Sequence, residues 1–346
     1  MGTMTAALYD GAGAMNIIQL DAPVAGPGEA LVRVRAVGIC GSDLLMNAGR
    51  TEADTLPAGH EVAGEIVAVG EGVEPGIVGQ RVAVDTIGLG RACQNCWYCR
   101  TGQYRSCMDR MPDSGGGFAQ YMTMLAAGCF PLSKNLSWHE GALVEPLAVS
   151  VHGMRRGGLR SGETVAVLGA GNIGLTAVAA ARAMGAGRIL VTARHPHQAE
   201  MARKLGTDVA VTPEGDALRD ALLEETEGRG ADLTIESVGG RTEATLQQAI
   251  DVTRVQGRIV VLGGFHAPIT LDWLPPLLKE QSFIFSSCYS VMDGRHDFEV
   301  AIELMSSGRV ALRQMVTHEF PLSEIQRGFD TAYDKTAGSI KVQLHS

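Results

Sequence analysis

The chain has 346 residues, 45% of them hydrophobic and 19% charged, which suits about two folded domains and excludes a disordered chain. The formal net charge is -9 at pH 7, so no broad basic surface for nucleic acid or an anionic membrane is expected. Residues 1–20 have neither a basic start nor a continuous apolar stretch, and no apolar run is long enough to cross a bilayer. We therefore expect a cytoplasmic protein that binds neither membrane nor nucleic acid.

The first 140 or so residues carry the patterns of β-strands. Residues 30–37, 65–69 and 81–84 are short segments with alternating or β-branched side chains, and Gly and Pro turns separate them. We predict a β-rich region there, joined by irregular Gly-rich loops.

The middle of the chain changes to strands that alternate with helices. Strands are predicted at 164–168, 188–192, 232–236 and 258–262, and helices at 173–184, 198–204 and 241–252. Crossovers of this length predict a parallel, doubly wound sheet, so the fold class is α/β. After about Tyr289 we predict helices at 296–306 and 322–334 and a strand at 340–344.

A glycine-rich loop follows the strand at 164–168 and precedes an Ala-rich helix. Gly169 allows the tight turn, Gly171 lets the backbone approach a pyrophosphate, and Gly174 lets helix and strand pack closely. Asn172 and Ile173 open the helix, whose N-terminus offers N–H groups to phosphates. The pattern predicts a dinucleotide site, and the alternative is a structural turn.

The residues after the next strand bear on the cofactor. An NAD site usually has an acid about 20 residues further on, but this chain has Ala193 and Arg194. A small residue followed by a cation leaves room and charge for a 2′-phosphate, which favours NADP(H) over NAD(H). Alternatively, Arg194 is a solvated surface cation and Glu200 or another acid serves NAD.

Four of the seven cysteines occupy fifteen residues, at Cys93, Cys96, Cys99 and Cys107. Four thiolates at this spacing can enclose one tetrahedral Zn²⁺ and leave no open position, which predicts a structural zinc site. Disulfides are disfavoured in a reducing compartment, and the Pro that follows the last Cys of an iron–sulfur pattern is missing.

A second group of potential ligands is spread over the chain. Cys40, His60 and a carboxylate could supply the three protein ligands of a catalytic zinc. From spacing alone the signal is weak, because a lone Cys is often a core residue and a lone His is often structural. Glu145 precedes Pro146 and could simply begin a helix.

Together these motifs resemble the zinc-containing medium-chain dehydrogenases. The resemblance covers essentially the whole chain and includes residues 38–43, 57–61, 116–121, 142–149 and 169–174 along with the four cysteines. It implies a GroES-like catalytic domain from residues 1–148 and 288–346, with a zinc lobe at about 90–110. It also implies a Rossmann domain at 149–287 and an active-site cleft between the two domains.

Within the family, residues 145–149 (EPLAV) are similar to those of the sorbitol and threonine dehydrogenases. By this resemblance Cys40 and His60 bind the catalytic zinc. Glu61 and Glu145 are the candidate carboxylates, of which one binds the metal directly.

Two further residues follow from the same resemblance. Asp43 would accept the free N–H of His60 and so orient the ring, and Ser42 would pass on the substrate's proton. Many relatives continue the proton route with a His at the place of Leu45, so the onward route is in question here.

The resemblance also extends the predicted cofactor site. NADP-using members of the sorbitol branch can carry Ala-Arg after the second strand, and a basic residue at the place of Lys341 can reach the pyrophosphate, although a surface lysine is an alternative. We also assign Val238 and Gly263, which follow the third and fourth strands, to cofactor binding.

The predicted reaction is hydride transfer between NADP(H), or NAD(H), and a secondary alcohol or ketone, such as a polyol, sugar alcohol, aminocyclitol or amino-alcohol. The alternatives are a threonine-type dehydrogenase that uses NAD, a zinc-free enone or quinone reductase, and a non-catalytic cofactor-binding protein. The family suggests a homodimer or homotetramer, with residues 260–278 as a possible interface.

Overall fold

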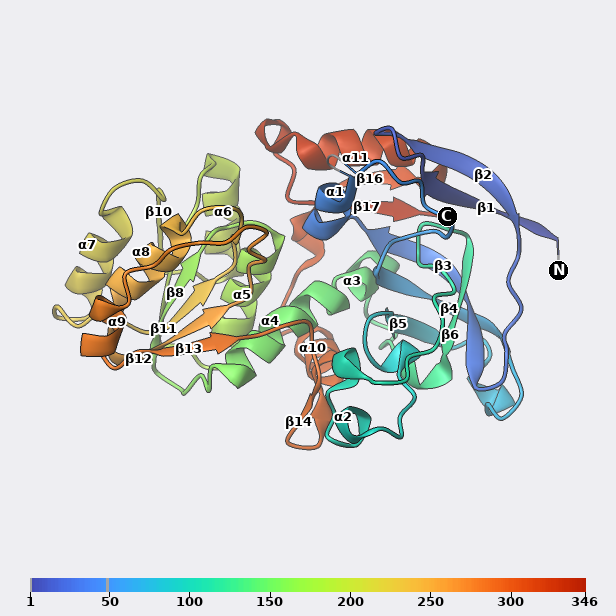
Figure 1. The fold of residues 1–346 in the computed structure, drawn as a ribbon, viewed down its shortest axis with the longest axis horizontal. Helices are drawn as coiled ribbons and strands as arrows, with labels where there is room; N and C mark the ends of the chain where they lie inside the picture. The colour runs from blue at the N-terminus through green and yellow to red at the C-terminus, as the bar shows by residue number, and fades with distance from the viewer. Residues whose placement is uncertain (1, 48–49) are drawn as a thin grey trace. The chain divides into compact units, whose positions relative to one another are not determined.

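The computed structural model describes residues 2–47 and 50–346, without the side chains of residues 45–47. The predicted departure at Leu45 therefore concerns a side chain that lies outside the described residues. The chain divides into two compact units (Figure 1). Unit 1 comprises Met1–Glu145, Ser290–Ser306 and Leu312–Ser346, and unit 2 comprises Pro146–Tyr289 and Ser307–Ala311. Among the described residues, none of the helices combines the length and the apolar composition that crossing a bilayer requires.

Unit 1 is built on a seven-stranded, mostly antiparallel sheet with the order β16-β17-β3-β4-β5-β7. β6 pairs with the first half of β3, and β17 pairs with its last residues. The strands of this sheet are β3 (Glu29–Gly38), β4 (Glu61–Val69), β5 (Arg81–Asp85), β6 (Tyr121–Leu125), β7 (Cys129–Pro131), β16 (Val316–Pro321) and β17 (Lys341–His345). Two smaller antiparallel pairs are β1 (Thr3–Tyr9) with β2 (Met15–Asp21), and β14 (Val291–Met292) with β15 (Arg295–His296).

Short helices complete unit 1. They are α1 (Gly41–Asn47), α2 (Trp97–Arg100), α3 (Trp138–Ala142), α10 (Asp297–Ser306) and α11 (Ile325–Tyr333). The core between sheet and helices is apolar, and Phe118 lies fully buried in it with its ring 5.7 Å from that of Phe329. α4 (Val144–Arg156) gives its first two residues to unit 1 and the others to unit 2.

Unit 2 contains a six-stranded parallel sheet with the order β10-β9-β8-β11-β12-β13. The strands are β8 (Thr164–Leu168), β9 (Arg188–Thr192), β10 (Val209–Val211), β11 (Ala231–Glu236), β12 (Thr253–Val261) and β13 (Ser282–Phe285). The helices are α5 (Asn172–Ala183), α6 (Pro196–Leu205), α7 (Ala217–Glu225), α8 (Ala244–Val252) and α9 (Leu274–Leu278). The predicted α/β class with a doubly wound parallel sheet is confirmed.

The order of the strands in unit 2 shows where a ligand would bind. The chain runs from β8 outward to β10 and then continues at β11 on the other side of β8. The loops that follow β8 and β11 therefore separate at the carboxyl edge of the sheet. In open α/β sheets this point is where ligands bind.

The predicted strands at 164–168 and 188–192 have the observed bounds, because buried parallel strands read as continuous apolar runs. Several other bounds were wrong. The strand predicted at 258–262 is β12, which begins at Thr253. β4 begins at Glu61 rather than residue 65, because its first four residues are all buried and show no alternation. α8 begins at Ala244 rather than 241, because Gly240 forms a β-bridge with Phe265 and the next three residues form a bend.

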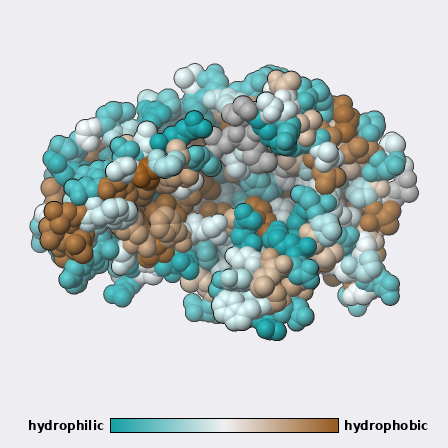
Figure 2. All heavy atoms as spheres, viewed as in Figure 1, coloured by the Kyte–Doolittle hydropathy of each residue, from teal (hydrophilic) through white to brown (hydrophobic). Residues whose placement is uncertain are grey.

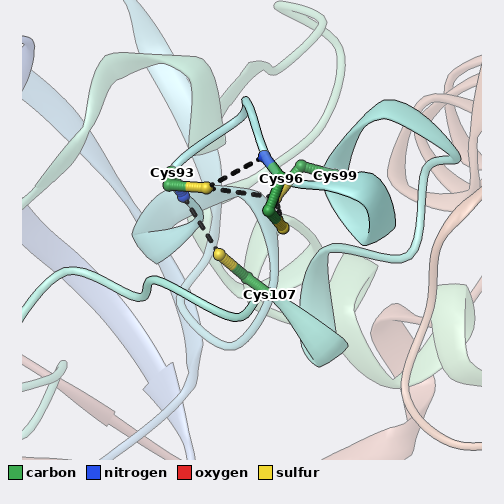
Figure 3. A group of neighbouring side chains, drawn as sticks. All are labelled: Cys93, Cys96, Cys99 and Cys107. Carbon is green, nitrogen blue, oxygen red and sulfur yellow. Dashed lines mark hydrogen bonds between the residues drawn. The ribbon is translucent and has the colours of Figure 1, made fainter.

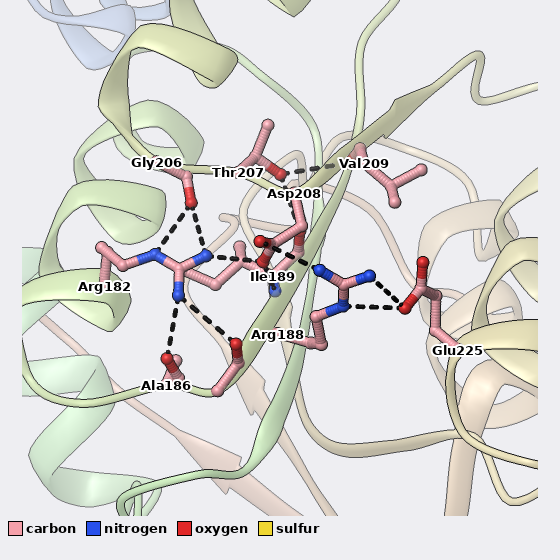
Figure 4. A network of polar contacts seen from close by, with 10 residues as sticks. Arg182, Ala186, Arg188, Ile189, Gly206, Thr207, Asp208, Val209 and Glu225 are labelled. Atoms are coloured by element: carbon pink, nitrogen blue, oxygen red, sulfur yellow. Dashed lines mark hydrogen bonds and ion pairs between the residues drawn. The ribbon is translucent and has the colours of Figure 1, made fainter.

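At the opposite edge of this sheet, two arginines share one carboxylate (Figure 4). Asp208 lies 2.5 Å from Arg182 of α5, and its second oxygen lies 3.4 Å from Arg188 of β9. It also accepts the backbone N–H of Ile189 at 2.8 Å, and Arg188 extends the network to Glu225 of α7 at 2.6 Å. Asp208 thus joins β9 to the end of α5, and Arg188 extends this connection to the end of α7.

We expect Asp208→Ala to lower the free energy of unfolding by about 1–2 kcal/mol, because it removes charge-assisted bonds at a partly exposed site. Urea denaturation measures this change. Glu200→Ala is the matched control, since Glu200 forms an exposed ion pair with Lys204 on α6 and its loss should cost less than about 0.5 kcal/mol. Equal losses in the two variants would contradict the structural role of Asp208.

Candidate functional site

The four predicted cysteine ligands come together in unit 1 (Figure 3). Their Sγ atoms all lie within 4.8 Å of one another. The Sγ of Cys99 lies 3.5 Å from that of Cys96 and 3.9 Å from that of Cys93. Zinc–sulfur bonds of about 2.3 Å in a tetrahedron place the sulfurs about 3.8 Å apart, whereas a disulfide needs about 2.05 Å. The spacing therefore fits a tetrahedral metal site.

Electrostatics around these thiols also fit a cation. The backbone N–H groups of Met108 and Cys99 lower the pKa of Cys96 to about 6, so this thiol ionises readily. Burial raises the pKa of Cys99 to about 12, and the neighbouring sulfurs add to the rise. A second thiolate next to the first thus requires a positive charge, which Zn²⁺ would supply.

A second cluster in unit 1 forms where β3 ends and β4 begins. Cys40 follows β3, His60 precedes β4, and Glu61 is the first residue of β4. One ligand atom from each lies within 4.8 Å of the other two. β3 and β4 are antiparallel neighbours with Gly38 opposite Glu61, and this pairing places a thiol, an imidazole and a carboxylate together although 20 residues separate them.

The charge of this cluster favours a cation. Burial by itself lowers the pKa of His60, but the hydrogen bond with Cys40 and the charge of Asp43 raise it by more, so this pKa lies well above its usual value. Burial raises the pKa of Glu145 to about 8, and the charge of Glu61 adds to the rise. Several buried acids around one imidazole are the setting in which a metal ion is stabilised.

The structure brings Glu145 near this cluster but not into its tightest group. Glu145 lies in the first turn of α4 and is 5% exposed, and its charge interacts with those of His60 and Glu61. It is not one of the three residues whose ligand atoms lie within 4.8 Å of one another.

The prediction for Lys341 was wrong. Lys341 is the first residue of β17 and its side chain is 1% exposed, so it has no surface from which to reach a pyrophosphate. Its ammonium contacts both carboxylate oxygens of Glu61, at 2.7 and 2.6 Å, and donates to the backbone oxygen of Ile39 at 3.1 Å. Each of the two buried charges thus has a partner, and either one left unpaired would be costly.

The backbone next to this pair leaves no room for a side chain. A Cβ atom on Gly38 would lie 1.9 Å from a carboxylate oxygen of Glu61. Residue 38 therefore has to be glycine for a steric reason, because β3 runs close to the Glu61–Lys341 pair.

Asp43 and Ser42 both lie in the first turn of α1. One oxygen of Asp43 accepts the backbone N–H of Cys40 at 2.8 Å, and the other is 3.7 Å from Nδ1 of His60, which is longer than a hydrogen bond. Asp43 thus holds the backbone of one potential ligand and lies beside the ring of another. Ser42 is exposed.

In unit 2 the glycine-rich loop lies between β8 and α5. Gly169 has a φ of +92°, and Thr192 accepts its N–H at 2.8 Å. A Cβ on Gly174 would lie 1.8 Å from the backbone oxygen of Gly169, whereas one on Gly171 would meet nothing within 4 Å. Gly174 is thus required by packing, and Gly171 leaves open space at the helix N-terminus, where Asn172 and Ile173 begin α5.

Other predicted cofactor residues lie around this loop. Val238 is 49% exposed, and its Cγ2 is 2.5 Å from the place of a Cβ on Gly169. Gly263 follows β12, and a Cβ there would lie 2.4 Å from a carboxylate oxygen of Glu236. Glu236 and Thr192 were not predicted as site residues from the sequence. The signal for Glu236 is an acid at the end of an apolar strand.

The residues after β9 border a cavity of about 680 Å³ in unit 2. Ala193 is buried and Arg194 lines the cavity, whose other walls include residues 213–216 before α7, the first turn of α7 and residues along the whole of α8. Arg219 is a second cation in the lining, which also contains the acids Glu214, Asp216, Glu243 and Asp251. Glu200 is not part of the lining.

A glycine-rich loop on a parallel sheet, together with clustered thiol, imidazole and carboxylate groups, defines a dehydrogenase that uses a metal ion. The family model for zinc-binding dehydrogenases matches residues 172–307, and that for the GroES-like domain of alcohol dehydrogenases matches residues 26–134. The chain belongs to the zinc-containing medium-chain dehydrogenases and is an oxidoreductase, as predicted.

Relatives and solved structures agree with this family. The chain is 34% identical to a sorbitol dehydrogenase of Bacillus subtilis, over 99% of this chain and 97% of the relative. An alcohol dehydrogenase from E. coli CFT073 complexed with NADH has a TM-score of 0.88 and 26% identity, and both chains are fully covered. A putative zinc-binding dehydrogenase from Sinorhizobium meliloti bound to NADP has a TM-score of 0.86 and 26% identity, again over both whole chains.

We expect Gly38→Ala to lower the free energy of unfolding by about 1–3 kcal/mol, because the new methyl group would displace the carboxylate of Glu61. Chemical denaturation of the purified protein measures the loss. Gly41→Ala provides the control: a Cβ there meets nothing within 4 Å and the residue lies in α1, so its stability should stay equal or rise slightly. If both variants are as stable as the parent, Gly38 does not lie so close to the carboxylate of Glu61 that a methyl group is excluded.

Proposed function

We propose that this protein interconverts a secondary alcohol and a ketone with NADP(H), using a catalytic zinc held by Cys40, His60 and a carboxylate. The observation that carries the proposal is the convergence of the Cys40 thiol, the His60 imidazole and the Glu61 carboxylate within 4.8 Å, with Glu145 buried close to them. Three protein ligands leave a fourth position for substrate, which is the arrangement of a catalytic zinc.

For the carboxylate ligand we propose Glu145. Glu61 is closer to Cys40 and His60, but both of its oxygens are held by Lys341. Glu145 is buried beside the cluster and its pKa is raised to about 8, so a metal ion would stabilise its ionised form. Glu61 then serves as the partner that keeps Lys341 buried and charged.

When bound, zinc would act as a Lewis acid on the substrate hydroxyl, and the nicotinamide would accept the hydride. Ser42 is exposed at the start of α1 and takes the proton that the hydroxyl gives up. Asp43 accepts the backbone N–H of Cys40 and lies beside Nδ1 of His60, where its charge favours one orientation of the ring. Both ligands are therefore positioned before substrate binds. Cys93, Cys96, Cys99 and Cys107 would hold a second, structural zinc.

We place the substrate among polyols, sugar alcohols, aminocyclitols and amino-alcohols. The similarity to a sorbitol dehydrogenase over nearly the whole chain supports a hydroxylated substrate. Four cysteine sulfurs at the spacing of a metal site rather than of disulfides support a reducing compartment such as the cytoplasm. Turnover with NADPH and NADH over a broad panel of alcohols and ketones, threonine included, tests the substrate class.

We expect Cys40→Ala to lose about one zinc per chain and to lower turnover more than about a hundredfold, while NADPH still binds. Zinc is measured by metal analysis and NADPH binding by fluorescence titration. Cys129→Ala removes a buried thiol outside both clusters and should keep metal and activity. Full turnover of Cys40→Ala, or a purified parent enzyme that is active without metal, would refute the catalytic zinc and favour a zinc-free reductase.

The same assay distinguishes the two carboxylates. Glu145→Gln should lose the catalytic zinc with the fold intact, whereas Glu61→Gln should lose stability because it leaves Lys341 buried without its partner. Loss of zinc in Glu61→Gln together with full zinc in Glu145→Gln would reverse the assignment.

For the cofactor we propose NADP(H) over NAD(H). The residue after β9 is Ala193 rather than an acid, and Arg194 lines the cavity of about 680 Å³ beside α7 and α8. A 2′-phosphate would fit beside a planar cation there. The acids in the lining would repel this phosphate, so its binding would depend on the attraction of Arg194.

We expect Arg194→Ala to raise the KM for NADPH about tenfold and to change the KM for NADH less than about twofold, because only NADPH carries the 2′-phosphate. Steady-state kinetics with both cofactors measure the difference. Arg203→Ala removes an exposed cation of α6 that does not line the cavity and should change neither value. Equal effects of Arg194→Ala on the two cofactors would argue for NAD(H).

We also propose that the protein forms a homo-oligomer through the edge of unit 2. β13 is the last strand of its sheet and pairs on one side with β12. Hydrophobic residues gather over α9 and β13 (Figure 2), and the exposed ones are Trp273, Leu274, Leu277, Leu278 and Phe285. An exposed edge strand with an apolar patch is a typical interface.

The double variant Leu277→Asp, Phe285→Asp should lower the molar mass in solution to that of a single chain, because each charge would be buried in the interface. Light scattering after gel filtration measures the mass. Leu223→Asp, on α7 away from the sheet edge, should keep the parent mass. A parent protein that is already a monomer contradicts the proposed interface.

A further inference from the structure

Glu236, the last residue of β11, is fully buried in unit 2. One of its carboxylate oxygens accepts three hydrogen bonds, from the N–H groups of Val238 and Gly239 at 2.9 and 2.8 Å and from the hydroxyl of Thr245 at 2.9 Å. Within residues 2–47 and 50–346, the other oxygen meets no hydrogen-bond donor. A buried carboxylate with one bare oxygen is costly, so its presence requires a reason.

The carboxylate of Glu236 lies between two loops at the carboxyl edge of the sheet, the one after β11 and the one after β12. The loop after β11 is joined to the loop after β12, because Gly240 donates to Gly264 at 2.8 Å and His266 donates to Gly240 at 2.9 Å. A Cβ on Gly263 would lie 2.4 Å from the bare oxygen of Glu236. Glycine at 263 thus makes the space that the carboxylate occupies.

The same loop after β11 also contacts the glycine-rich loop. The hydroxyl of Ser237 donates to the backbone oxygen of Leu168 at 2.7 Å and lies 2.9 Å from the place of a Cβ on Gly174. Val238 lies against Gly169, with its Cγ2 2.5 Å from the place of a Cβ there. A shift of Ser237 and Val238 would therefore be transmitted to the turn that precedes α5.

We propose that Glu236 is a positioning residue for dinucleotide binding. Its charge draws two backbone N–H groups and the first turn of α8 onto one oxygen, and this holds Ser237 and Val238 against the Gly169–Gly174 loop. The inference rests on the proposed function in one respect, namely that this loop binds NADP(H) or NAD(H). Glu236 itself is fully buried, so it acts through Ser237 and Val238.

Glu236→Gln tests this role because it keeps the size and an acceptor oxygen but removes the charge. We expect the Kd of both NADPH and NADH, measured by fluorescence titration, to rise about tenfold, since three charge-assisted bonds become neutral ones. Both cofactors should be affected equally, because the glycine-rich loop binds the pyrophosphate that they share. Turnover at saturating cofactor should stay within about twofold of the parent value.

The matched control is Glu163→Gln, at the amino edge of the same sheet. Glu163 is also largely buried, and it contacts Arg258 at 2.5 Å and accepts the N–H of Arg160 at 2.9 Å. This variant should lower the melting temperature as Glu236→Gln does but leave both Kd values unchanged. Parent-like Kd values in Glu236→Gln, or equal weakening in Glu163→Gln, would overturn the positioning role.

A second variant keeps the test decisive if Glu236→Gln does not fold. Thr245→Val removes one of the three donors with little change in shape, and we expect both Kd values to rise about threefold. Unchanged Kd values in a folded Thr245→Val protein would overturn the proposal. If the parent protein binds neither NADPH nor NADH, the proposed function itself is refuted, which is a different result from parent binding that the variants do not alter.

Discussion

Unit 1 depends on one buried ion pair. Lys341 holds Glu61 where β3, β4 and β17 meet, with both side chains shielded from water. The pair neutralises only one of the negative groups in this region, since Cys40, Asp43 and Glu145 lie in the same surroundings. In a buried site such an excess of potential negative charge requires another cation, and this need explains why the cluster suits zinc.

Unit 2 depends on close approach between backbones. The loops after β8, β11 and β12 contact one another at the carboxyl edge of the sheet, and at Gly174, Gly239 and Gly263 there is no space for a side chain. Glu236 supplies the polar centre of these contacts. Loops held in this way need little reorganisation when a ligand binds, so less of the binding energy is spent on ordering them. Steric and electrostatic constraints thus act together at the proposed dinucleotide site.

Features that depend on residues close together in the sequence were predicted best. The apolar run of β8, the glycine-rich loop and the start of α5 follow one another in the chain, and the α/β class follows from them. Bounds failed where tertiary contacts dominate, as at the fully buried first residues of β4. Lys341 was misassigned because neither its burial nor its partner Glu61, 280 residues away, leaves a trace in the local sequence.

By itself the sequence determined the class of sheet, the glycine-rich turn and the family to which the chain belongs, because each depends on residue types at short, regular spacing. The four-cysteine lobe is also local, and its spacing already predicts a tetrahedral ligand set. Only the tertiary structure decided that Lys341 is the buried partner of Glu61, that Gly38 is required beneath it, and that Glu236 joins three loops. These features depend on strand register and burial, which arise from long-range pairing and cannot be read from any one segment.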